Sequence, residues 1–360
     1  MKIENLVRDN IRRLKPYSSA RSEYSGTASV FLDANENGHD LFGGSLNRYP
    51  DPLQGALKER IAKQKKVAPE NIFLGNGSDE AIDLLFRIFC EPGVDEAVTC
   101  PPTYGMYQVQ ADIHGTPVQR VLLDESFNLR PEEVMAVVSP KTKMLFLCSP
   151  NNPTGNLLDP AAIEFLLKNF PGIVVVDEAY GDFSGAPSWS QRLAEFPNLV
   201  VLQTFSKAWA LAGARLGMAF ASPEIIHYLN SVKYPYNVGL PTQRAVLTAF
   251  EKQEVVAALD EILTERKRLA EALGQFSFVE KIYPSDANFL LVKMKDSMLI
   301  FNYLKQNSVV VRDRSKEPLC DGCLRITVGT ATENSTLLEM LGVYEKQHPK
   351  NSITQNSITQ

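Results

Sequence analysis

The stretch Ile173–Tyr180, IVVVDEAY, gives the clearest indication of the fold. Its four apolar residues run without polar alternation, which is typical of a strand buried on both faces. Similar runs occur at 72–74 (IFL), 144–148 (MLFLC) and 199–202 (LVVL), and helix-like stretches such as PAAIEFLLKNF at 160–170 lie between them. The pattern predicts an α/β fold whose large domain has a mostly parallel central sheet, covered by helices on both faces.

The chain length predicts more than one domain. Its 360 residues exceed the ~250 to 300 at which single hydrophobic cores stop growing. Beyond residue 266 a charged helix is followed by short strands, which is typical of a smaller α+β domain. We expect an N-terminal segment at 1–45 that packs on the small domain or on a partner subunit, a large domain at 46–265, a small domain at 266–346, and a disordered tail at 347–360 with the duplicated sequence NSITQNSITQ.

Composition excludes several classes of function. A net charge of −5 argues against nucleic acid as the main partner, because phosphate backbones attract basic surfaces. The chain has no signal peptide pattern and no apolar run of ~18 residues, so we expect a cytoplasmic protein without membrane contact. Only Cys320 and Cys323 of the five cysteines form a CxxC pair, and neither a second pair nor histidines lie nearby. Reduced thiols are therefore a better interpretation than a metal site.

Polar residues follow each of the four apolar runs, where ligands of α/β sheets bind. The endings are GNGSDE, SPNNPTG, DEAY and QTFSK. Gly77, Ser78 and Asp79 begin a predicted helix, whose free amides suit a phosphate group. The alternative is an ordinary helix start with Ser78 as its N-cap. Asn152 lies in a turn made rigid by two prolines, although such a turn can also be purely structural.

Two charged residues among apolar neighbours need a chemical explanation. Asp177 ends a predicted central strand, where a carboxylate is costly unless it is hydrogen-bonded or ion-paired. Lys207 lies in TFSKAWALAGARLG at 204–217, among small apolar residues. An amine whose pKa is lowered by burial attacks carbonyl groups readily. The alternatives are an aspartate that caps a loop and a lysine that reaches out to solvent.

In this order the four endings resemble those of the fold type I pyridoxal-phosphate aminotransferases, over nearly the whole chain except the tail. The resemblance implies that Lys207 is the catalytic residue and forms a Schiff base with pyridoxal 5′-phosphate (PLP). It implies further cofactor contacts from Gly77, Ser78, Asp79, Ser206 and Arg215 at the phosphate, Tyr104 stacked on the ring, Asn152 and Tyr180 at the phenolic oxygen, and Asp177 at the ring nitrogen.

Within that group, LKPYSSAR, NRYPD and RDRSKEPLCDGCLRITVGT are similar to stretches of the histidinol-phosphate aminotransferases. The implied reaction belongs to L-histidine biosynthesis and is a ping-pong transfer from L-glutamate to imidazole acetol phosphate, which gives 2-oxoglutarate and L-histidinol phosphate. The implied enzyme is a homodimer with shared active sites. Its remaining site residues are Tyr17 and Asn35 in the side-chain pocket, Arg312 and Arg325 on the substrate phosphate, and Tyr49 on the cofactor phosphate of the neighbouring subunit.

Other functions remain open at this point. An aromatic or broad-specificity aminotransferase and a threonine-phosphate decarboxylase share much of this scaffold. A regulator that only senses the cofactor is a third alternative, although the motifs begin too near the N-terminus to leave room for a DNA-binding domain.

Overall fold

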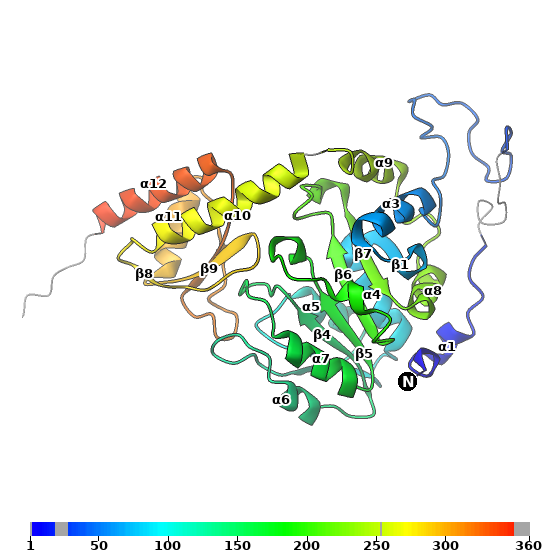
Figure 1. The fold of residues 1–360 in the computed structure, drawn as a ribbon, viewed down its shortest axis with the longest axis horizontal. Coiled ribbons are helices and arrows are strands. Elements are labelled where there is room, and N and C mark those ends of the chain that lie inside the picture. Colours follow the sequence, from blue (N-terminus) through cyan, green and yellow to red (C-terminus); the bar gives the residue numbers. More distant parts are fainter. Residues whose placement is uncertain (1, 19–27, 253, 349–360) are drawn as a thin grey trace, which may run out of the picture.

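The computed structural model describes residues 2–18, 28–252 and 254–348, arranged around two β-sheets (Figure 1). The tail predicted at 347–360 lies outside the described residues from position 349 on. The larger sheet has the strand order β1-β7-β6-β5-β4-β2-β3. Its strands are β1 (Ile72–Asn76), β2 (Glu96–Thr99), β3 (Val118–Arg120), β4 (Thr142–Cys148), β5 (Ile173–Asp177), β6 (Leu199–Thr204) and β7 (Leu216–Ala221).

The four apolar runs lie in β1, β4, β5 and β6, and the predicted, mostly parallel sheet is confirmed. The exception is β7, which pairs antiparallel with both β1 and β6. It returns directly after the loop that follows β6, so Gly217 pairs with Thr204. The carboxyl ends of β4, β5 and β6 therefore meet at one edge, as parallel strands require.

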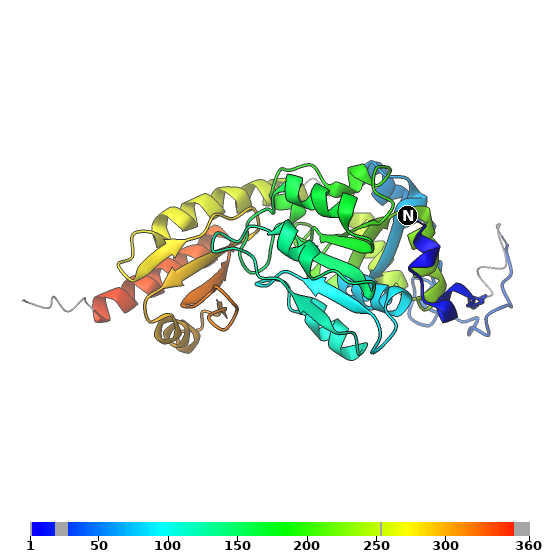
Figure 2. The ribbon, with the colours of Figure 1, turned by 90° about the horizontal axis from the view of Figure 1, so that it is seen from below.

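Helices cover both faces of this sheet, as Figure 2 shows. Successive residues of β4 alternate between two cores: Phe146 packs into one, and Leu145 and Leu147 into the other. This two-sided burial explains why the strands lack polar residues. The helices of this part are α1 (Asp9–Arg12), α3 (Gly55–Lys65), α4 (Gly77–Phe89), α5 (Met106–Ile113), α6 (Pro131–Ala136), α7 (Pro160–Asn169), α8 (Pro223–Val232) and α9 (Leu240–Ala249).

The second part is a four-stranded antiparallel sheet with the order β10-β11-β9-β8 and its own apolar core. Helix α10 runs into it from the large part, so the boundary predicted at 265/266 falls within a continuous helix (Figure 1). The elements are α10 (Glu254–Leu273), β8 (Val279–Ile282), β9 (Phe289–Met294), α11 (Ser297–Gln306), β10 (Arg312–Asp313), β11 (Cys323–Thr327) and α12 (Ala331–Gln347).

The first described residues pack on the large part of the structure. Contact of the segment at 1–45 with the small domain or a partner subunit stays a prediction. Ile3 and Val7 are buried in the core of the large part, beside α4 and α8. Arg8 donates to the Ile88 carbonyl and pairs with Glu91, which fixes the segment there. The physical reason is that burial removes these two apolar side chains from water. None of the described helices is long and apolar enough to span a bilayer.

Candidate active site

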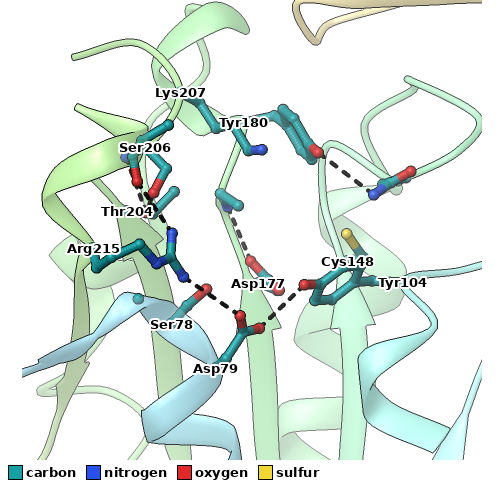
Figure 3. A pocket seen from close by; sticks show the side chains of 14 residues that line it. Ser78, Asp79, Tyr104, Cys148, Asp177, Tyr180, Thr204, Ser206, Lys207 and Arg215 are labelled. Carbon is teal, nitrogen blue, oxygen red and sulfur yellow. Dashed lines mark hydrogen bonds and ion pairs between the residues drawn. The ribbon is translucent and has the colours of Figure 1, made fainter. Parts of the chain in front are cut away.

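A cavity of about 270 Å³ opens where β4, β5 and β6 end, next to the start of α4 (Figure 3). It brings together all the cofactor residues predicted from the sequence except Tyr49. The loops that follow the three strands deliver these side chains, because parallel strands end at a common edge. The predicted residues that line it are Gly77, Ser78, Asp79, Tyr104, Asn152, Asp177, Tyr180, Ser206, Lys207 and Arg215.

Asp177 lies on the cavity floor and is only 2% exposed. Its Oδ2 accepts a hydrogen bond from the Tyr107 hydroxyl at 2.8 Å, and its Oδ1 accepts from the Ala179 amide at 3.0 Å. Burial raises the pKa of Asp177 to about 6, and these two hydrogen bonds limit the rise. Among the described residues no basic side chain forms an ion pair with it. A buried carboxyl of this kind suits a cationic ligand atom.

The start of α4 forms one wall, and its first amides lack intrahelical acceptors. Gly77 has a φ of +71°, and a Cβ there would come within 2.8 Å of Arg215 Nη2. A Cβ on Gly217 would overlap the backbone of Gly77 and Ser78. The two glycines thus let the helix start approach β7 and Arg215. The alternative interpretation of Ser78 as the N-cap of this helix is wrong. The helix begins at Gly77, and the N-cap side chain makes no capping hydrogen bond.

Arg215 lies beside that helix start, and Ser206 lies on the same side of the cavity (Figure 3). The Arg215 guanidinium is about half exposed, and its Nη2 lies 3.9 Å from Asp79 Oδ2. The Ser206 hydroxyl accepts from Thr204 Oγ1 at 3.0 Å. The Gly77 amide donates to the Arg215 carbonyl at 3.0 Å. A cation, hydroxyls and the next amides of the helix start therefore converge on one end of the cavity, a combination that binds phosphate.

The Lys207 side chain extends into the cavity between Ser206 and Tyr180 (Figure 3). Its Nζ lies 5.7 Å from the centre of the Tyr180 ring. Loss of hydration among the surrounding groups lowers the pKa of Lys207, and the positive charges of Arg325 and Arg215 add to this effect. The side chain still faces the open cavity, so the amine is accessible to a ligand. A larger neutral fraction makes it a better nucleophile.

Tyr104, Asn152 and Tyr180 form the opposite wall. The Tyr104 hydroxyl donates to Asp79 Oδ1 at 3.1 Å, which fixes its ring beside the cavity. The Asn152 amide nitrogen donates to the Tyr180 hydroxyl at 3.4 Å. Phe289 of β9 packs edge-on against the Tyr180 ring. The small sheet therefore supports this wall.

Arg325 reaches the cavity wall from β11, where its Nη1 donates to Asn152 Oδ1 at 2.6 Å. Burial lowers the pKa of Arg325, and its guanidinium also lies over the Phe289 ring. Arg312 pairs with Arg325 across β10 and β11 but is exposed. Neither arginine lines the 270 Å³ cavity itself; both lie on the side of the small sheet.

Three predicted site residues lie away from this cavity within the single chain. Tyr17 is 77% exposed, and Asn35 is an exposed residue with a φ of +55°. Tyr49 is half exposed and stacks on Tyr236 with ring centres 4.4 Å apart. Within one subunit, these three residues therefore do not contact the cavity at which they were predicted to bind substrate or cofactor.

Sequence reasoning missed Tyr107, Cys148 and Thr204. Cys148 and Thr204 line the cavity because they end β4 and β6, a position that could have been deduced from the strand runs. Tyr107 is fully buried and supports Asp177 from α5. Tyr107 is the second tyrosine of PPTYGMY. It could have been proposed from the sequence as a hydrogen-bond donor to Asp177, because a buried carboxylate requires donors. All five cysteines are free, buried thiols.

Comparisons with known proteins agree with this geometry. The histidinol-phosphate aminotransferase of Parabacteroides distasonis is 54% identical over 340 residues, covering 94% of this chain and 98% of that protein. The enzyme of the same name from Bacteroides thetaiotaomicron is 52% identical and covers 95% of this chain and 99% of its own length.

Solved structures share the fold. The histidinol-phosphate aminotransferase of Clostridium acetobutylicum matches with a TM-score of 0.77 at 24% identity, covering 84% of this chain and 92% of that one. The Sinorhizobium meliloti enzyme, solved in complex with pyridoxal-5′-phosphate, matches with a TM-score of 0.75 at 23% identity over 82% of this chain and 83% of that one.

The family model described as aminotransferase class I and II matches residues 21–341, which include every strand and nearly every helix of the structure. The match contains all the cavity residues described above. The chain therefore belongs to the class I and II aminotransferase family.

Proposed function

We propose that this chain is a histidinol-phosphate aminotransferase, which transfers an amino group between L-glutamate and imidazole acetol phosphate in L-histidine biosynthesis. Near full-length relatives at 52 to 54% identity carry this name. The observation that carries the proposal is a single cavity that joins a lysine of lowered pKa, a buried aspartate and a phosphate-binding end. Such an enzyme of amino-acid synthesis would act in the cytoplasm.

The cavity residues fit PLP. Asp177 supplies a buried acid for a protonated ring nitrogen, and Lys207 supplies an amine for the aldehyde. The α4 amides with Ser206 and Arg215 match the phosphate. Gly77 and Gly217 keep the space at the helix start free of side chains. When bound, PLP supplies an aldehyde that condenses with amines and a ring that accepts electrons from the substrate Cα.

Lys207 would act first as the attachment point and then as the proton carrier. Its lowered pKa increases the neutral fraction of the amine, and the neutral amine would accept a proton from the substrate Cα. Asp177 would hold the ring nitrogen protonated through charge attraction, while Tyr107 keeps that carboxylate ionised. Asn152 and Tyr180 would orient the ring through its phenolic oxygen, and the Tyr104 ring would cover one of its faces.

Arg325 and Arg312 would bind the acidic group of each substrate. Arg325 faces the cavity wall, and its contact with Asn152 joins the substrate site to the cofactor site. One anion-binding group would then accept a carboxylate of glutamate in one half-reaction and the phosphate of histidinol phosphate in the other. Two parallel hydrogen bonds from a guanidinium suit both ligands.

A homodimer with shared sites would explain the residues that lie away from the cavity. The arm between residues 28 and 49 exposes several large apolar side chains, a costly arrangement in water. A second copy would cover them and would receive Tyr49 at its cofactor phosphate. The exposed fractions are 91% for Leu32, 87% for Phe42, 74% for Leu41 and 68% for Val30.

Steady-state kinetics of the PLP-loaded enzyme test the substrate. Activity with histidinol phosphate and 2-oxoglutarate should exceed that with phenylalanine or tyrosine by at least about 100-fold in kcat/KM, since missing a bound phosphate costs several charge-assisted hydrogen bonds. Equal activity with the aromatic amino acids would mean a broad-specificity enzyme. Release of carbon dioxide from threonine phosphate would mean a decarboxylase.

A further inference from the structure

A third arginine shares the register of Arg312 and Arg325. Arg312 pairs with Arg325, and the amide of Arg314 donates to the Cys323 carbonyl at 3.0 Å, so the β10–β11 ladder continues one step beyond Asp313. Side chains two residues apart on a strand point to the same face. Arg314 therefore leaves the small sheet on the same side as Arg312 and Arg325.

That face of the small sheet is turned toward the large domain. Cys323 and Leu291 belong to a core that includes β4 and β5 residues of the large sheet. Leu324 and Ile326, on the other face, pack into the core of the small domain. The three arginines thus lie on the side that closes over the cavity.

Few of the described acidic side chains neutralise the positive charge of Arg312, Arg314 and Arg325. Arg314 is mostly buried, its closest acid is Glu317 at 3.4 Å, and its Nε is buried without a hydrogen-bond partner. Arg325 is bonded to an amide, and its Nε is also buried and unpartnered. Within the described parts of the chain, Glu317 is the only acid that pairs with this group. Uncompensated buried cations are costly, so the arrangement indicates an anionic ligand.

Arg314 also affects the electrostatics of residues at the cavity wall. Burial lowers the pKa of Arg325, and the charges of Arg314 and Arg312 lower it further. Burial raises the pKa of the Tyr180 phenol, and Arg325 and Arg314 both oppose that rise. Arg314 is therefore within electrostatic range of a wall residue of the cofactor cavity, although it does not line the cavity.

We infer that Arg314 joins Arg312 and Arg325 in the substrate anion site and makes that site favour a phosphate group over a carboxylate. The inference rests on the proposed function. A phosphate monoester carries about −1.5 to −2 charges at pH 7 and three acceptor oxygens, whereas a carboxylate carries one charge and two oxygens. A third guanidinium matches the additional charge and oxygen, and adds less for glutamate.

The test compares the two half-reactions of the PLP-loaded enzyme in Arg314→Gln. The control is Lys316→Gln, which removes an exposed cation two residues along the chain. The dissociation constant for histidinol phosphate should rise by about 10-fold or more in Arg314→Gln, and that for L-glutamate by less than about 3-fold. Lys316→Gln should change both by the same small factor. Equal losses for the two substrates, or none, would overturn the inference.

A second measurement is independent of the natural substrate. Inorganic phosphate and acetate are titrated calorimetrically into the PLP-loaded protein, in which the cofactor already fills its own phosphate site. Wild type should bind phosphate more tightly than acetate, and Arg314→Gln should lose this preference while Arg314→Lys keeps part of it. If Arg314→Gln retains the preference, the inference is wrong. If the preference depends on Arg314 but histidinol phosphate is not a substrate, the proposed function fails and the anion site remains.

Discussion

Tyr107→Phe is the most informative single change, because it removes one hydroxyl beneath the cofactor site and leaves the cavity lining intact. The Tyr107 hydroxyl donates to Asp177 Oδ2 at 2.8 Å, and both residues are buried. Without that hydrogen bond, the Asp177 carboxylate keeps only the Ala179 amide as a donor. Its ionised form becomes less stable, so its pKa should rise above about 6.

The magnitude follows from the titration of Asp177 in the cofactor-free protein. Its pKa rises from 3.8 in the unfolded chain to about 6 in the fold, so the folded state holds the proton longer. The contribution of Asp177 to the free energy of unfolding is therefore fully present below pH 3.8. This contribution falls by about 3 kcal/mol as the pH rises to 6, at about 1.4 kcal/mol per pKa unit. Tyr107→Phe should raise the pKa of Asp177 further, so the loss continues to higher pH. At pH 8 the free energy of unfolding should fall by about a further 1 to 3 kcal/mol.

Urea unfolding of the cofactor-free protein at pH 5, 6.5 and 8 measures this effect. The deficit of Tyr107→Phe relative to wild type should grow with pH, and PLP affinity at pH 8 should fall by about 10-fold. Tyr303→Phe, which deletes a hydroxyl in the small domain, controls for loss of a tyrosine oxygen. An unfolding deficit that does not vary with pH, combined with unchanged PLP affinity, would refute the role assigned to Tyr107.

Three other outcomes are expected. Gly217→Ala should prevent PLP binding, measured by cofactor absorbance, because its Cβ would overlap the start of α4; full PLP occupancy would contradict this. Asp159→Ala should lower the unfolding free energy by about 0.5 to 2 kcal/mol in urea, since Asp159 caps α7 through the Ala161 amide, and PLP affinity should not change. Mixing inactive Tyr49→Ala with inactive Lys207→Ala subunits should restore part of the activity if Tyr49 serves the neighbouring site; no recovery in confirmed mixed dimers would place Tyr49 elsewhere.

The fold and the cofactor cavity were largely predictable, because both depend on local signals. Apolar runs define parallel strands, and parallel strands bring their carboxyl ends together, so Lys207, Asp177 and Asn152 had to meet. The antiparallel β7 was not predicted, since LGMAFA follows the lysine loop without a helix between them. Its direction depends on chain reversal within a short loop.

Other features depend on contacts that a sequence pattern does not contain. Tyr107 supports Asp177 across 70 positions of the chain, and only the packing of α5 against the large sheet brings them together. A role for Arg314 was not predicted, because an arginine on a strand is typical of a surface position. Only the register of β10 against β11 shows which face of the sheet it occupies. Ile3 and Val7 pack on the large domain through apolar contacts that short segments do not encode.

Transfer of isotope between the two substrates tests the central claim most directly. The PLP-loaded enzyme is incubated with ¹⁵N-labelled L-glutamate and imidazole acetol phosphate, and histidinol phosphate is analysed by mass spectrometry. Wild type should produce ¹⁵N-labelled histidinol phosphate, and Lys207→Ala should produce none while still folding. Absence of labelled product with the wild-type enzyme, or its formation at the wild-type rate without Lys207, would contradict the account.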